Sequence, residues 1–178
     1  MGSCGYTLGV MALVLAGCAT AQTPVAGQGA GTSVAPAPLV QVSQDTCPSD
    51  TVWLRGDFGT ARFSVDVADD GPKRSQGLMF VEHMPMSKGM LFVYPRPQRV
   101  AFWMKNTLIP LDMIFADERG VVTKVHSNAI PGDLTSIPGE GLVQYVLEIN
   151  GGLARQLQIA PGAQFQHPAI QDPAWPCD

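Results

Sequence analysis

From residue 51 onward, the chain is a series of short apolar segments separated by turns that contain glycine or proline. Residues 62–68 alternate strictly, with Phe63, Val65 and Val67 on one face, as is typical of a half-buried strand. Repeated short segments of this kind predict a mainly-β domain, either a sandwich or a partly closed barrel with jelly-roll-like character. No βαβ alternation is visible. The predicted strands cover residues 52–54, 62–68, 90–94, 100–104, 111–116, 121–126, 142–149 and 164–167.

Two short helices are expected beside these strands. The first covers residues 73–78, because Asp70 can cap it and Pro72 suits a first helical turn. The second follows Gly152 and ends near Leu157. The segment at 100–104 is apolar on both faces, which favours a central position in the sheet. Residues 117–120 form a hairpin turn with Gly120 in the left-handed conformation.

The first 44 residues carry no charged side chain. Residues 6–16 form an apolar run too short to span a bilayer, and the run ends in Leu15-Ala16-Gly17-Cys18. This arrangement resembles a bacterial lipoprotein signal, which implies that residues 1–17 are removed and that Cys18 takes lipid, including palmitate. Ala19 after the cysteine implies the outer membrane. The alternative is an ordinary cleaved signal, and no Lys or Arg precedes the apolar run.

Residues 18–44 are rich in Ala, Gly and Pro and cannot bury enough apolar surface to fold, so we interpret them as a flexible tether. Residues 45–178 then form a single mainly-β domain. The expected location is the bacterial cell envelope, with the domain held on the outer membrane by its lipid and facing the periplasm.

Two cysteines remain in the predicted domain, Cys47 and Cys177, one near each end. In an oxidising compartment such a pair suggests a disulfide that ties the termini together. Two free or intermolecular thiols are the alternative.

The formal net charge of −4 argues against a nucleic-acid partner, which would require a basic patch. No Cys-x-x-Cys, His-Glu-x-x-His or Gly-x-Ser-x-Gly pattern is present, so no cofactor is implied. We expect a monomer.

The stretch FWMKNTLIPLD at 102–112 places polar side chains inside an apolar run. Together with GLMF at 77–80, GMLFV at 89–93 and YVLE at 145–148, it resembles the motifs of domain-of-unknown-function family 192 over about residues 63–165. The resemblance implies a mainly-β, jelly-roll-like fold and brings no established activity, cofactor or site residue. Val81 stands where that family often has a basic residue.

Five residues of the central stretch are candidates for a binding site: Trp103, Lys105, Asn106, Thr107 and Asp112. In one interpretation they form an architectural corner, with Trp103 in the core, a Lys105–Asp112 pair and turn caps. In the other they line a pocket with an aromatic platform and a few polar groups.

Glu148 is a lone acid in an apolar strand, so burial would raise its pKa. A pair formed by Glu148 and Asp112 would suit a hydrolase that cleaves glycosides. More often such an acid pairs with a nearby cation such as Lys105.

The methionines suggest one further alternative. His83, Met84 and Met86 lie together in a loop, and soft thioethers with an imidazole select Cu(I). Methionine also fills irregular cores, which is the simpler explanation for most of the others. The leading interpretation is a non-catalytic envelope domain that binds a small molecule or a glycan.

Replacing Cys18 with serine should release the protein from membranes, because the lipid would be its sole anchor. Fractionation of cells that express the Cys18→Ser variant and the wild type measures this. A variant that stays in the membrane fraction would contradict the lipoprotein assignment.

Overall fold

The structure is a computed structural model that describes residues 47–177. It contains two short helices, α1 (Gly71–Gln76) and α2 (Leu153–Gln156). The strands are β1 (Thr51–Gly56), β2 (Gly59–Ala68), β3 (Lys88–Gln98), β4 (Ala101–Phe102), β5 (Leu111–Ala116), β6 (Val122–Ala129), β7 (Ile137–Pro138), β8 (Val143–Asn150) and β9 (Gln164–Gln166). No helix among these residues is long and apolar enough to cross a membrane.

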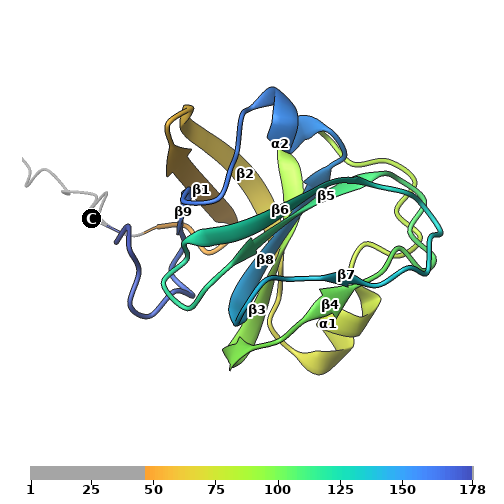
Figure 1. Ribbon diagram of the computed structural model, residues 1–178, viewed down its shortest axis with the longest axis horizontal. Helices are drawn as coiled ribbons and strands as arrows, with labels where there is room; N and C mark the ends of the chain where they lie inside the picture. The colour runs from red at the N-terminus through yellow and green to blue at the C-terminus, as the bar shows by residue number, and fades with distance from the viewer. Residues whose placement is uncertain (1–46, 178) are drawn as a thin grey trace, which may run out of the picture. The chain divides into compact units, whose positions relative to one another are not determined.

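Seven strands form one sheet in the order β6-β5-β8-β3-β2-β1-β9, and β4 pairs with β7 in a small second sheet (Figure 1). The large sheet curls until β9 meets the chain that enters β6. There the N–H of Val122 donates to the carbonyl of Ala163 at 2.8 Å, and Val121 forms a bridge with Gln164. The prediction of a mainly-β, partly closed barrel with two short helices is confirmed.

The two faces of the sheet pack two separate cores. Along β8, Tyr145, Leu147 and Ile149 point into the barrel, where they meet side chains from every other strand of the large sheet. Val146, one step along the same strand, points outward into a second core built with β4, β7 and the loops that follow α1 and β4. Both faces of β8 and β5 are therefore buried, as expected for strands in the middle of a covered sheet.

Several sequence predictions need correction. Residues 100–104 do not form a central strand, because only Ala101 and Phe102 pair, and they pair with β7 in the small sheet. The absence of a βαβ unit was also predicted wrongly. β2 and β3 are parallel neighbours, and the chain between them carries α1 as a crossover.

The helix and turn predictions are closer to the structure. Asp70 caps α1 by accepting a hydrogen bond from the N–H of Lys73 at 2.7 Å, and Pro72 lies in the first turn. The hairpin between β5 and β6 turns through Gly120, whose φ of +75° is in the left-handed region that favours glycine.

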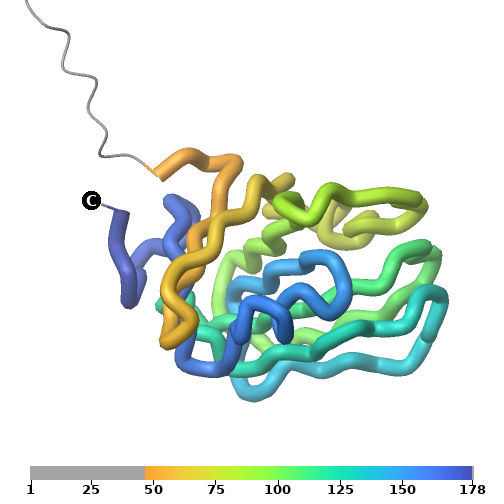
Figure 2. Tube along the Cα trace, turned by 90° about the horizontal axis from the view of Figure 1, so that it is seen from above, coloured from red at the N-terminus to blue at the C-terminus, as the bar shows by residue number. Residues whose placement is uncertain are grey.

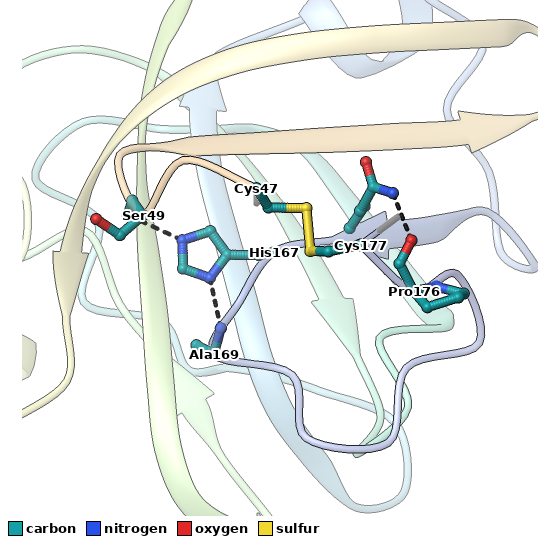
Figure 3. Close-up of a disulfide and its surroundings, with 7 residues drawn as sticks. Cys47, Ser49, His167, Ala169, Pro176 and Cys177 are labelled. Carbon is teal, nitrogen blue, oxygen red and sulfur yellow. Dashed lines mark hydrogen bonds between the residues drawn. A yellow bond between two sulfur atoms is a disulfide. The ribbon is translucent and has the colours of Figure 1, made fainter. Parts of the chain in front are cut away.

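A disulfide joins Cys47 to Cys177, with the Cα atoms 5.6 Å apart (Figure 3). The start and the end of the described chain lie on the same side of the domain (Figure 2). Beside the disulfide, His167 accepts a hydrogen bond from the N–H of Ala169 at Nδ1 and approaches the carbonyl of Ser49 with Nε2 at 3.0 Å. Burial lowers the pKa of His167, so the neutral ring has a structural role.

Asp112 ties three segments together at the end of the barrel next to α2. One carboxylate oxygen accepts the N–H groups of Asn128 at 2.6 Å and Gly152 at 2.8 Å, and the other accepts the N–H of Ala154 at 2.6 Å. The side chain is completely buried. The bonds from Gly152 and Ala154 satisfy donors at the start of α2 that have no partner within the helix.

The Asp112→Asn variant should lose about 3 kcal/mol of unfolding free energy. An asparagine side chain has one oxygen that can accept hydrogen bonds, and its amide nitrogen, itself a donor, would face a buried backbone N–H group without bonding to it. Urea unfolding measures the change. Asp133→Asn is a matched control, since Asp133 also accepts a backbone N–H, that of Thr135, but is exposed. Equal losses in the two variants would contradict this role of Asp112.

Candidate functional site

A cavity of about 240 Å³ opens on the outer face of the sheet, between α1, β3, β4 and the loop after β4. In Figure 1, α1 and β4 lie beside β3 at this end of the domain. We call it the Glu148 cavity. Its lining includes Arg74, Phe92, Tyr94, Trp103, Lys105 and Glu148.

Glu148 comes from the centre of the sheet. Its neighbours across the strands are Met90 on β3 and Met113 on β5, so the acid lies in an apolar environment. The side chain is 4% exposed. Among residues 47–177, every polar side-chain atom that is fully enclosed has a hydrogen-bond partner. The Glu148 carboxyl group has no hydrogen bond to any of these residues, so its oxygens are not fully enclosed and reach the cavity.

Burial raises the pKa of Glu148 to about 8. Neither Arg74 nor Lys105 lowers it, although both line the same cavity. Burial also raises the pKa of Tyr94. The positive charge of Arg74 lowers the pKa of Tyr94, and the negative charge of an ionised Glu148 raises it further. At neutral pH the cavity therefore holds a protonated carboxylic acid near a phenol.

Trp103 and Lys105 border the cavity on a loop whose position is fixed by Met104, the residue between them. Met104 is fully buried, accepts the N–H of Gly132 and donates to the carbonyl of Asp133. Trp103 and Lys105 therefore both point away from this anchor, and the ammonium of Lys105 lies 5.1 Å from the centre of the Trp103 ring. The expectation that Trp103 is a core residue is wrong, because its side chain is 49% exposed.

The rest of the loop is a tight turn. The N–H of Thr107 donates to the carbonyl of Met104, and Asn106 has a φ of +53°. The carbonyl of Asn106 accepts the N–H of Phe80, which itself has a φ of +64°, an uncommon value for a bulky residue. Thr107 is buried and lines the cavity, whereas Asn106 is exposed and is not among the lining residues.

Asp112 does not belong to this site. In the pairing of β5 with β8, Asp112 lies opposite Ile149 and Met113 lies opposite Glu148, so the two acids point to opposite faces of the sheet. The three backbone N–H groups described above occupy the Asp112 carboxylate. The proposed pair of Lys105 and Asp112 is therefore absent, and the catalytic pair of Asp112 and Glu148 cannot form.

The three residues considered for copper do not converge either. Met84 is buried in the outer core, while Met86 is 54% exposed and His83 is exposed. Among residues 47–177 there is also no cluster of three or more His, Cys, Asp or Glu side chains that could hold a metal.

Sequence reasoning missed two titratable members of the cavity, Arg74 and Tyr94. The guanidinium of Arg74 donates to the carbonyls of Asp69 and Val93 and lies 5.1 Å from the centre of the Tyr94 ring. Alternation along β3 places Tyr94 on the same face as Met90, the neighbour of Glu148. This signal is useful only once the pairing of β3 with β8 is known.

Two of the larger hollows are less suited to a site, because their lysine and aspartate side chains already have partners. In the hollow beside β6 and β7, Lys124 donates to the carbonyl of Pro138, and Asp133 accepts from Thr135. In the hollow beside α1 and β2, Lys73 contacts Asp69 and Asp66 lies 3.8 Å from Lys88.

The model of domain-of-unknown-function family 192 (DUF192), described as an uncharacterized ACR, matches residues 53–167. This chain belongs to DUF192. The match includes every residue of the Glu148 cavity, so the site lies within the family domain. No curated protein matches the chain.

Two solved structures resemble this DUF192 chain. A protein of unknown function from Novosphingobium aromaticivorans DSM 12444 is 39% identical, with 65% of this chain and 82% of the other covered and a TM-score of 0.64. A candidate transcription regulator from Sinorhizobium meliloti 1021 is 36% identical, with 67% and 94% covered and a TM-score of 0.65.

The Glu148→Gln variant of this DUF192 domain should gain stability relative to wild type as pH rises. The unfolded acid ionises near pH 4.5 and the folded one near pH 8, so between these values folding retains a proton that the unfolded chain has lost. Wild-type stability should therefore fall by about 1.4 kcal/mol per pH unit in this window and level off above it.

Urea unfolding at pH 5, 7 and 8.5 measures this difference. Glu118→Gln is the control, because Glu118 is exposed in the hairpin turn after β5. A gain for Glu148→Gln that does not change with pH would show that the folded acid is already ionised.

Proposed function

We propose that this DUF192 chain is an exported, lipid-anchored domain of the cell envelope that binds a small molecule or a glycan in the Glu148 cavity without catalysis. One observation carries the proposal: a half-exposed Trp103 and a buried, unpaired Glu148 border the same hollow. Ligand sites typically combine an aromatic surface with a few polar groups in a concave setting.

The polar groups of the cavity are arranged for contact with a ligand. Lys105 is exposed at the edge, and Thr107 and Tyr94 supply hydroxyl groups in the lining. The edge is held by a backbone hydrogen bond between the loops at residues 79–80 and 103–107, in which the N–H of Phe80 donates to the carbonyl of Asn106. A fixed edge reduces the conformational entropy that a ligand must overcome on binding.

The envelope location is supported by chemistry at both ends of the chain. The lipoprotein-like sequence that ends at Cys18 lies outside the described residues. A disulfide such as that between Cys47 and Cys177 is typical of proteins in an oxidising compartment. We therefore propose a monomer held on the outer membrane by its lipid and facing the periplasm.

A thermal-shift screen of the wild type with neutral saccharides, organic cations and organic anions tests the binding proposal. A ligand at one hundred times its dissociation constant should stabilise the protein by about 2.7 kcal/mol through mass action. Trp103→Ala should abolish this shift. Because Trp103 is half-exposed, its loss should lower the stability of the free protein by only about 1–2 kcal/mol.

Leu142→Ala is the matched control, since Leu142 is an apolar side chain of similar exposure that does not line the cavity. It should respond to ligands as the wild type does. The proposal fails if no compound of any class stabilises the wild type more than Trp103→Ala.

A further inference from the structure

We propose that the Glu148 cavity selects small organic cations, in which an ammonium group pairs with the Glu148 carboxylate among aromatic rings. This inference rests on the proposed binding function and names the chemical class of its ligand. The four aromatic side chains of the lining are Phe92, Tyr94, Phe102 and Trp103. Aromatic faces attract cations, including quaternary ammonium groups, and the attraction is stronger when the cation is removed from water.

The position of Glu148 supplies the first argument. A buried carboxyl group normally has a hydrogen-bond or ionic partner, because burial without one is costly. Glu148 is 96% buried, reaches the cavity and has no partner among residues 47–177. A ligand that brings a positive charge would supply the missing partner.

The charges around the cavity supply the second argument. The titratable groups that face Glu148 across the lining are Tyr94 from β3, Arg74 from the end of α1 and Lys105 from the loop after β4. Tyr94 is neutral near pH 7, since its pKa is raised. Arg74 is held by two backbone carbonyls and by the Tyr94 ring, and the ammonium of Lys105 lies against Trp103.

Neither cation therefore neutralises the acid. If the guanidinium of Arg74 or the ammonium of Lys105 reached Glu148, it would lower the pKa of the carboxyl group. Burial is instead the one cause of the shift in the pKa of Glu148. The space beside Glu148 is open to an external ammonium group, while Lys105 at the edge disfavours larger cations that would extend out of the cavity.

Binding of a cation would also release a proton. The carboxyl group is protonated below pH 8 in the free protein, and an ammonium group favours the carboxylate. The affinity for a permanent cation should therefore rise about tenfold per pH unit up to about pH 8 and then become constant.

Choline and 3,3-dimethylbutan-1-ol are suitable probes, because they share one shape and differ in charge. Calorimetric titration of the full chain from pH 5.5 to 9 should show choline binding at least tenfold more tightly than the alcohol at pH 8. Only choline should show the pH dependence and the release of about one proton per molecule bound below pH 8.

Two variants assign the effect to Glu148. Glu148→Gln should weaken choline binding at least tenfold and remove its pH dependence, and it should remain folded because the uncharged amide lowers the cost of burial. Glu118→Gln, an exposed acid outside the cavity, should behave as the wild type.

Other outcomes separate this inference from the function on which it rests. Equal binding of choline and the alcohol, or tighter binding of 3,3-dimethylbutyrate as pH falls, would overturn the selection of cations and leave the binding function in place. Failure of every compound in the thermal-shift screen would overturn both.

Discussion

The pairing of β8 with β3 on one side and β5 on the other is the constraint on which the rest of the structure depends. It fixes a register in which Leu147 lies opposite Leu91 and Ile114, and these side chains fill the barrel. Side chains alternate along a strand, so the same register sends Glu148 to the other face. A shift by one residue would place the acid in the barrel and turn the barrel residues to the outer face.

Two buried acids of this domain show how surroundings decide the role of a side chain. Asp112 accepts three backbone N–H groups, which satisfy its oxygens and make it part of the scaffold. Glu148 lies between methionines and has no such donors, so its charged form is disfavoured and its bonding capacity is left for a ligand. Adjacent strands carry both acids, yet their functions differ because the donors differ.

The sequence predicted the local features of the fold well. Alternation located β2, the acidic cap and proline located α1, and Gly120 located the hairpin turn, because each feature depends on neighbours in the chain. The apolar run at 100–104 was assigned wrongly. The backbone of Met104 is hydrogen-bonded to the loop that follows β6 and does not pair with strands on either side, and an apolar pattern cannot distinguish these environments.

By itself the sequence determined the fold class, the membership of DUF192 and the stretch at 102–112 that contributes Trp103, Lys105 and Thr107 to the cavity. Only the tertiary structure decided that Glu148 and Tyr94 join them and that Asp112 does not. The reason is physical: which residues share a face of a sheet depends on strand order and register, and these are set by contacts between distant segments. The parallel pairing of β2 with β3, made through α1, brings the remaining wall of the cavity into place.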